Sequence, residues 1–502
     1  MNHKLQLEVG INLYTASQVR DIELSYAKTD PAGTYPLMEK AGKAAFETLK
    51  SHWPEARKVL VLAGPGNNGG DGFIVARLAT KQRFKTTLCN FCEPEKIKGD
   101  AKIAYDSLPT TGLRRLEWAS VDLSEYDLVI DAMLGTGVKG TLRSPYDQVI
   151  TKLNQSPVPV LAIDIPSGLE ADTGNAANGA VEAELTVTFI GNKRGLYTGD
   201  AANYRGKVIL ASLGIPEQCF AHHEFNVIAE NWRSLRKKIK PRKLSSHKGE
   251  HGHCVIVGGS QGMTGAALLA STAALRSGAG LTSALIESGA ESLVASHPEV
   301  MAKNQVLPDD SCLALFEKAT CLIIGPGLGQ GERGSQWMSY LQRHGTEKFK
   351  VFDADALNWL SLNPDVDEKR ILTPHPGEAG RLLGISSQEV NQDRFSAAQK
   401  IVDKYGGVCV LKGAGTIISD SRGINIVCPV GNPGMATGGM GDVLSGIIGS
   451  LIAQGHSLLE AASLGVCVHG EAADKAAGTS LRYRGLLASD LFKHLPVLLN
   501  PI

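Results

Sequence analysis

Short apolar runs alternate with segments of helical spacing in the first part of the chain. The clearest runs predict strands at residues 59–63, 128–131, 160–164, 187–190 and 207–210. Runs that are apolar throughout are typical of strands buried on both faces of a parallel sheet. Before them, residues 15–50 have helical spacing that is interrupted at 31–33, and Ser17 is the expected helix cap.

The alternation starts again after residue 252. Strands are predicted at 254–257, 321–324, 350–352, 371–372 and 408–411, and a hairpin at 416–418 and 424–427. Between these halves no glycine-loop strand unit occurs, and bases cluster at 233–243, which predicts a solvated connector. We therefore predict an α/β protein with two doubly wound sheet domains, residues 1–222 and 223–502.

Composition limits the class of ligand. A chain of 502 residues exceeds what one core usually serves, and 51 lysines and arginines balance 51 aspartates and glutamates. This balance gives no net field for nucleic acid or anionic lipid. Without a leader pattern or a long apolar run, we expect a cytoplasmic protein that binds small molecules, with no nucleic-acid or membrane partner, and a homo-oligomer. The nine cysteines show no ligand spacing and are predicted to be reduced packing residues.

The first candidate site follows the strand at 59–63. Residues 64–72 are rich in glycine, match GxGxxG, have Glu93 about twenty residues further on, and precede a helix predicted at 73–80. That match alone is weak. Asn67, Asn68 and Asp71 add amides and a carboxylate where a bound phosphate would tolerate no anion, so the loop is also suited to another ligand or a cation.

Two more polar turns follow the strands at 128–131 and 160–164. Each could be a structural turn whose aspartate caps the next helix. Because carboxyl ends of parallel strands meet at one edge, the three turns are expected to converge on one crevice. Asp131, Asn68 and the region of Ser167 offer hard oxygens for a cation, whereas residues 135–141 offer backbone amides for phosphate.

The second candidate site lies in the other half. The glycine-rich residues 431–442 precede an apolar helix predicted at 443–453, and a helix N-terminus of this kind favours a phosphate or an oxyanion. Asp442 would face that pocket either as a base toward a substrate hydroxyl or as a helix cap. Lys412 and the turn after it could hold a nucleotide, although no Walker loop occurs.

Taken together, the motifs resemble those of the bifunctional NAD(P)H-hydrate repair enzymes. NNGGDG, GTGVKG and DIPSG are similar to the epimerase part; GGSxxxxGA, GPGLG, DADAL, TPHPGE, KGAGT and NPGMATGGMGD are similar to the dehydratase part. The resemblance covers residues 13–215 and 226–499. It implies a Rossmann-like N-terminal domain that interconverts R and S NAD(P)HX. It also implies a ribokinase-like C-terminal domain that dehydrates S-NAD(P)HX with ADP, giving NAD(P)H, AMP and phosphate.

The resemblance also implies roles for individual residues. In the epimerase it implies catalysis by Asp164 and binding of NADHX or NADPHX by Asn67, Asn68, Gly69, Gly70, Asp71, Gly135, Thr136, Gly137, Val138, Lys139, Gly140, Thr141 and Asp164. Potassium would lie at Asn68, Asp131 and Ser167. In the dehydratase it implies catalysis by Asp442, and Mg²⁺ would accompany ADP. The hydrate would contact Ala267, Gly327, His375 and Asp442, and the adenine nucleotide would contact Lys412, Gly413, Ala414, Gly415, Thr416 and Gly441.

Two alternatives stay open at this point. One is a vitamin-precursor kinase of the hydroxymethylpyrimidine type with an N-terminal nucleotide-binding module; the other is an N-terminal sensor or interaction module without turnover. This sequence departs from the sugar-kinase pattern at one place: it has His375-x-x-Glu378 where the superfamily's sugar kinases have asparagine-x-x-glutamate. This departure argues against a simple sugar or alcohol kinase.

Overall fold

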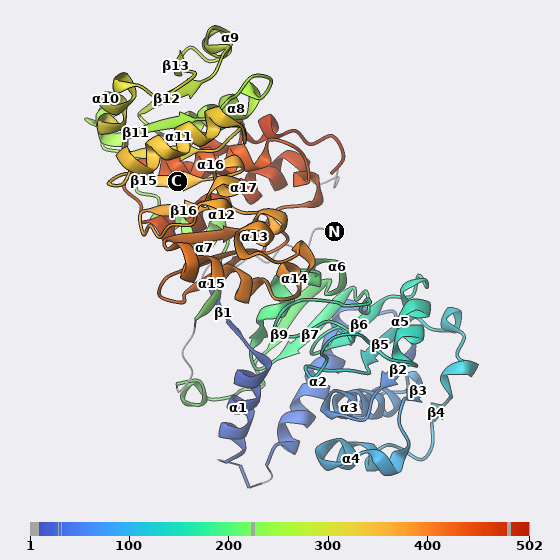
Figure 1. The fold of residues 1–502 in the computed structure, drawn as a ribbon. Helices are drawn as coiled ribbons and strands as arrows, with labels where there is room; N and C mark the ends of the chain where they lie inside the picture. The colour runs from blue at the N-terminus through green and yellow to red at the C-terminus, as the bar shows by residue number, and fades with distance from the viewer. Residues whose placement is uncertain (1–9, 29, 32, 222–225, 479–482, 501–502) are drawn as a thin grey trace. The chain divides into compact units, whose positions relative to one another are not determined.

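The computed structural model describes residues 10–28, 30–31, 33–221, 226–478 and 483–500. Contacts divide the chain into two compact units, Asn12–Val227 and Ile228–Ile502 (Figure 1). The domain limits 1–222 and 223–502 stay a prediction. Each unit is an α/β structure with a largely parallel sheet, which confirms the predicted class.

The sheet of the N-terminal unit has the strand order β4-β3-β2-β5-β6-β7-β9, with neighbours parallel. Its strands are β2 (Lys58–Ala63), β3 (Lys85–Asn90), β4 (Leu113–Arg115), β5 (Leu128–Ala132), β6 (Val160–Ile163), β7 (Leu185–Phe189) and β9 (Lys207–Ala211). A short strand β1 (Ile11–Tyr14) pairs with β8 (Asn192–Lys193). Strand β3 was not predicted, because its threonines, although buried, break the apolar run.

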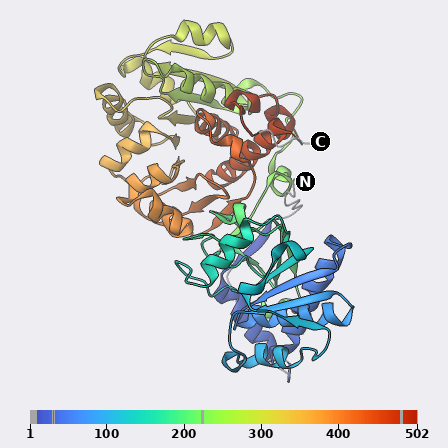
Figure 2. The same ribbon diagram turned by 90° about the vertical axis from the view of Figure 1, so that its right-hand side faces the viewer.

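The helices of this unit cover both faces of the sheet (Figure 2). They are α1 (Ala16–Ala27), α2 (Tyr35–His52), α3 (Asn67–Lys81), α4 (Gly99–Asp106), α5 (Tyr146–Asn154) and α6 (Ala201–Tyr204). Helices α2 and α3 pack into the core on one face and α5 into the core on the other. The predicted cap of α1 was wrong: Thr15, not Ser17, begins the helix, because Thr15 and Gln18 form a reciprocal capping box.

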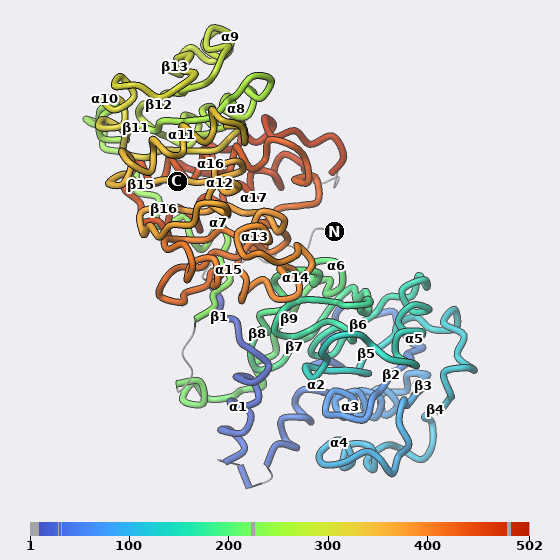
Figure 3. Tube along the Cα trace, viewed as in Figure 1, coloured from blue at the N-terminus to red at the C-terminus, as the bar shows by residue number. Residues whose placement is uncertain are grey.

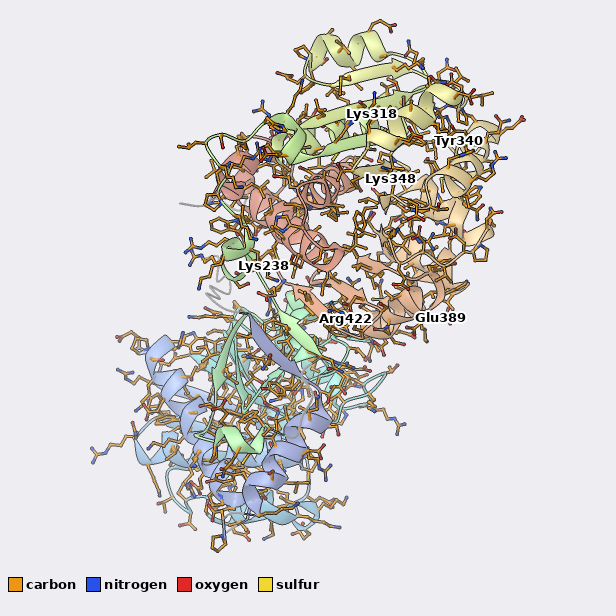
Figure 4. All side chains as sticks on the ribbon, turned by 90° about the vertical axis from the view of Figure 1, so that its left-hand side faces the viewer. Lys238, Lys318, Tyr340, Lys348, Glu389 and Arg422 are labelled. Carbon is orange, nitrogen blue, oxygen red and sulfur yellow. The ribbon has the colours of Figure 1, made fainter. Side chains whose placement is uncertain are left out.

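The strands of the C-terminal unit follow the order β13-β12-β11-β14-β15-β16-β17-β18-β19-β10. They are β10 (Val227–Ala229), β11 (His253–Val257), β12 (Leu281–Ile286), β13 (Met301–Asn304), β14 (Cys321–Ile324), β15 (Phe349–Phe352), β16 (Arg370–Leu372), β17 (Val408–Leu411), β18 (Thr416–Asp420) and β19 (Asn425–Cys428). The parallel order runs from β13 to β17, and β17, β18 and β19 are antiparallel, which confirms the predicted hairpin. Arg422, labelled in Figure 4, lies in the turn of this hairpin. Its guanidinium forms an ion pair with Asp420.

The main helices of the C-terminal unit are α7 (Trp232–Leu235), α8 (Thr264–Arg276), α9 (Ala290–Ser296), α10 (Asp310–Lys318), α11 (Glu332–His344), α12 (Asp355–Leu362), α13 (Pro376–Leu383), α14 (Ser387–Gln392), α15 (Arg394–Tyr405), α16 (Met440–Ala453), α17 (Leu458–Ala477) and α18 (Leu495–Leu499) (Figure 3). Helices α8, α16 and α17 supply much of one core. Helix α16 is buried on nearly every side, which explains its largely apolar sequence.

The predicted connector at 233–243 was partly wrong. Leu235 is buried in the C-terminal core, and the indole nitrogen of Trp232 donates to the carbonyl of Leu498. The beginning of the basic run is therefore anchored to the core by apolar residues, while its charged side chains are exposed to solvent.

All nine cysteines are free, and eight of them are buried. Among the described residues, no helix has both the length and the apolar composition needed to span a membrane.

Candidate functional sites

The glycine-rich residues after β2 form a helix start rather than an extended loop, so the prediction that the helix begins at residue 73 was wrong. Helix α3 begins at Asn67, with Gly66 as its N-cap. The glycines are required by close backbone contacts: a Cβ on Gly64 would lie 1.8 Å from the carbonyl oxygen of Met133, and one on Gly69 would lie 1.9 Å from that of Gly64. This packing places Asn68 and Asp71 in the buried first turns of α3.

A cavity of about 610 Å³ lies beside this helix start. It brings together the predicted residues Asn67, Asn68, Asp71, Gly135, Thr136, Gly137 and Asp164. Gly69 and Gly70 are buried in α3. Four other predicted residues are described by the structure but do not line the cavity: Val138, Lys139, Gly140 and Thr141. The amide of Gly140 instead donates to Glu170, so the second half of this turn runs away from the cavity.

Asp164 is held rigidly at the cavity wall. Its backbone has φ +64°, a strained conformation for a residue with a side chain, of the kind that clusters at functional sites. Its Oδ1 accepts hydrogen bonds from the ammonium of Lys193, the hydroxyl of Thr188 and the amide of Phe189. The Lys193 side chain is only 1% exposed. A buried cation thus fixes one oxygen of the carboxylate, and Asp164 lines the cavity.

Two of the other carboxyl groups that line the cavity, Asp71 and Glu23, are influenced by Asp164. Burial and the nearby carboxylates of Asp164 and Glu23 raise the pKa of Asp71 well above its usual value. Burial and Asp164 likewise raise the pKa of Glu23, which belongs to α1. Lys193 opposes both shifts. The cavity therefore places Asp164 beside two carboxyl groups that bind protons readily, an arrangement suited to moving a proton.

The three predicted metal-site residues meet below the cavity. Asp131 is fully buried and accepts hydrogen bonds from the hydroxyl (2.6 Å) and the amide (2.8 Å) of Ser167. The amide nitrogen of the Asn68 side chain donates to the carbonyl oxygen of Leu134, and the Ser167 hydroxyl oxygen lies 3.2 Å from the same carbonyl. Among the described residues, the buried Oδ1 of Asn68 has no hydrogen-bond partner. This orphaned oxygen, with the carbonyl and hydroxyl oxygens around it, fits a weakly hydrated cation.

Sequence reasoning missed Lys193 and Glu23. The available signal for Lys193 was a charged residue soon after the apolar strand β7. Glu23 gave none, because a glutamate on an amphipathic helix is usually a solvated residue. Only the folded structure, in which Glu23 lines the cavity, identifies it.

The C-terminal site begins at the N-terminus of α16. This helix starts at Met440, three residues before the predicted start, with Gly439 as its N-cap in the left-handed conformation. Asp442 lies in the first turn, and among the described residues no side chain caps this helix. Asp442 therefore does not act as a side-chain cap of this helix. Burial, and after it the neighbouring Asp353, raise the pKa of Asp442 to about 7, which suits a general base at neutral pH.

Lys412 lies next to this turn. Its ammonium donates to Oδ1 of Asp353 over 3.0 Å and is 3.7 Å from Oε2 of Glu378. Burial opposes its charge, but the Asp353 and Glu378 carboxylates raise its pKa. A Cβ on Gly441 would lie 3.3 Å from the ammonium, so the predicted nucleotide residues Lys412 and Gly441 are adjacent.

His375 begins α13. Its Nδ1 accepts the amide hydrogen of Gly377, and its own amide donates to Glu378. Because Nδ1 is an acceptor, the neutral ring carries its proton on Nε2. Partial burial lowers the pKa of His375, so the ring is a neutral hydrogen-bond donor rather than a cation near pH 7.

The remaining predicted residues lie on two loops and one helix. Ala267 is buried in α8, and a Cβ on Gly327 would lie 2.7 Å from the carbonyl oxygen of Met263, just before that helix. The turn of Gly413, Ala414 and Gly415 is closed by Thr416, whose hydroxyl donates to the Gly413 carbonyl. These loops follow β14 and β17, at the carboxyl edge of the same sheet.

Each half of the chain matches a known protein family. Residues 34–195 match the family described as YjeF-related protein N-terminus, and residues 254–497 match NAD(P)H-hydrate dehydratase. The bifunctional NAD(P)H-hydrate repair enzyme Nnr of Coxiella burnetii is 44% identical over 97% of this chain and 99% of its own. That of Escherichia coli (strain K12) is 41% identical over 99% and 96%. A ribokinase-like superfamily protein from Enterococcus faecalis V583 has a TM-score of 0.50 and 29% identity, over 55% of this chain and 96% of its own. This similarity confirms the predicted ribokinase-like fold.

Proposed function

The chain belongs to the family of bifunctional NAD(P)H-hydrate repair enzymes, and we propose that each half performs one step of the repair of hydrated NADH and NADPH. The N-terminal half interconverts the R and S epimers of NAD(P)HX. The C-terminal half dehydrates the S epimer with ADP and releases AMP and phosphate. The observation that carries this proposal is the position of Asp442 in the first turn of α16, next to Gly441, which lies against the ammonium of Lys412.

Dehydration needs activation because hydroxide is a poor leaving group. Asp442 takes the proton from the hydroxyl on C6 of the hydrated ring as that oxygen bonds to the β-phosphorus of ADP, and AMP leaves. The C6–O bond then breaks, phosphate departs, and loss of a ring proton from C5 restores the double bond of NAD(P)H. Lys412 and the amides around Gly441 stabilise the negative charge on the transferred group.

The rest of the C-terminal site orients the two substrates. His375 donates from Nε2 to the hydrate, because its Nδ1 is occupied by the amide of Gly377. Ala267 and Gly327 are small, and their backbones leave room for the hydrated ring. The turn from Gly413 to Thr416 holds the adenine nucleotide. Mg²⁺ bound with ADP would neutralise charge on the phosphates.

In the N-terminal site Asp164 exchanges a proton with the substrate. Its Oδ1 is held by Lys193, so its other oxygen is available to the ligand in the cavity. Asp71 and Glu23 have raised pKa values that favour protonation, so they act as the proton donors to the substrate while Asp164 acts as the acceptor. Asn67, Asn68 and residues 135–137 bind the nucleotide part of the substrate, and 138–141 extend this contact outside the cavity.

Potassium is the proposed cation of the N-terminal domain. The residues that would hold it are Asn68, through its unpartnered Oδ1, with Asp131 and Ser167 beneath. The ion would supply positive charge next to the phosphates of the substrate. The cytoplasmic location and the homo-oligomer stay predictions of the sequence.

A vitamin-precursor kinase is the less supported alternative, because the relatives that match both halves are named repair enzymes. One experiment separates the two. Mixed NADHX epimers are incubated with the protein, Mg²⁺ and either ADP or ATP, and the absorbance of the reduced nicotinamide is followed together with free phosphate. Repair predicts complete recovery of NADH with one phosphate released for each molecule; a stable phosphorylated product would support the kinase.

A further inference from the structure

Asp353 follows strand β15 and carries three hydrogen bonds at a position 2% exposed. Its Oδ1 accepts from the ammonium of Lys412 (3.0 Å) and the hydroxyl of Thr373 (2.9 Å). Its Oδ2 accepts from the hydroxyl of Ser445 (2.8 Å). Both oxygens are thus occupied by donors from the protein, which leaves Asp353 poorly placed to act on a substrate directly.

These bonds connect four elements of the site. Asp353, Thr373 and Lys412 follow the adjacent strands β15, β16 and β17, and Ser445 belongs to α16. A Cβ on Gly441 would lie 3.4 Å from Oδ2 of Asp353, so the first turn of α16 lies directly against this carboxylate. Asp442 lies between the two α16 residues, Gly441 and Ser445, that contact Asp353.

The carboxylate remains ionised in this buried place. Burial alone would raise the pKa of Asp353, but Lys412 and the hydrogen bonds from Ser445 and Thr373 hold it below its usual value. The charged groups that act on Asp442 are Asp353 and, from α12, Asp355, which raise its pKa, and Lys412, which lowers it. Glu378 and the buried, neutral His469 lie around Lys412.

We propose that Asp353 is a positioning residue of the dehydratase: it holds the Lys412 ammonium and the first turn of α16 so that Lys412 and Asp442 face the same transferred phosphoryl group. The proposal rests on the assignment of dehydration to this site. Asp353 contributes in two ways. It fixes the direction of the ammonium, and its negative charge keeps Asp442 basic enough to accept the hydroxyl proton.

The test is the pH profile of the full-length Asp353→Asn variant with S-NADHX and ADP. Asparagine removes the negative charge while Lys412 stays, so the acid limb of kcat is expected to move to lower pH by about one unit. The kcat at the alkaline plateau is expected to fall by about tenfold or more, because the ammonium loses its anchor. A lower kcat with an unmoved acid limb would overturn the proposal, since a merely structural defect lowers activity at every pH alike.

A matched control is Asp367→Asn. Asp367 forms a 2.7 Å ion pair with the buried Lys350, near the other ends of β15 and β16. The Asp367→Asn variant should leave both the plateau and the acid limb of kcat unchanged.

If Asp353→Asn does not fold, Ser445→Ala provides the test, because it removes one hydrogen bond and keeps both charges. It should lower kcat while the KM for ADP stays constant; a wild-type kcat would refute the positioning role. Wild-type protein that recovers no NADH would instead refute the proposed function.

Discussion

The hydrogen bonds that the described residues make to the carboxylate of Asp164 all end on one oxygen, Oδ1, and one of them comes from the buried ammonium of Lys193. Asp164 is thereby held without being enclosed, because it also lines the cavity that contains Asp71 and Glu23. Lys193 therefore acts on both Asp71 and Glu23, whose pKa values it lowers, as well as on Asp164. This relationship makes the roles of the two residues separable.

Asp164→Asn should remove epimerisation at every pH. The loss expected for a general acid or base is about 10²- to 10⁴-fold, measured as the rate at which purified R-NADHX equilibrates with the S epimer. ADP-dependent recovery of NADH from the S epimer should be unchanged. An Asp164→Asn protein that equilibrates the epimers at the wild-type rate would exclude Asp164 from the chemistry.

Lys193→Met should behave differently from Asp164→Asn. Lys193 lowers the pKa values of Asp71 and Glu23, so its loss favours protonation of the carboxyl cluster near neutral pH. Epimerase activity should fall less than in Asp164→Asn, and its alkaline limb should move to higher pH, because Asp71 and Glu23 stay protonated over a wider range. An unmoved alkaline limb in Lys193→Met, with the melting temperature of the N-terminal domain retained, would contradict this role.

Asp442→Asn tests the base of the dehydratase. We expect a loss of two orders of magnitude or more in NADH recovery, with little change in melting temperature, because Asp442 caps no helix. In the wild type, activity should fall as the pH drops through about 7, since a protonated Asp442 accepts no proton. Nucleotide affinity and epimerase activity serve as controls. Retention of most dehydratase turnover in the mutant would return Asp442 to a structural role.

Asn68→Ala tests the proposed cation site, because it removes the orphaned oxygen and leaves Asp131 and Ser167 paired. Replacing sodium by potassium should raise the melting temperature of the wild-type N-terminal domain and have less effect on this variant. Asp131→Ala should also reduce the potassium effect. It should in addition destabilise the domain by about 1 to 3 kcal/mol, because two buried Ser167 donors lose their acceptor. Equal potassium effects in all three proteins would argue against the site.

We expect the two domains to act independently, and expression of residues 1–222 and 223–502 as separate chains tests this expectation. Each half has its own hydrophobic core, so the first should retain epimerase activity and the second ADP-dependent dehydration. Both activities are compared with those of the full chain at equal concentration. Soluble halves without activity would show that each site depends on the other half.

The sequence alone determined the two parallel sheets and the turns that carry the chemistry. Uninterrupted apolar runs reveal strands buried on both faces, and the polar turns after them reveal the edge at which ligands bind. This pattern is sufficient to place Asp131, Asp164, Lys412 and Asp442 at strand or helix ends. Several strands were not predicted, among them β3, β12 and β13, whose apolar runs are broken by polar residues.

Only the tertiary structure decided which charges meet. Lys193 reaches Asp164 across 29 positions of the chain and Lys412 reaches Asp353 across 59, and no local periodicity specifies such pairs. Nor could the sequence show that α3 begins at Asn67, because glycine has a low helix propensity. Gly64, just before the helix, is required by a close backbone contact with Met133. Proton affinity depends on burial and on neighbouring charge. The shifted pKa of Asp442 is therefore a property of the folded chain.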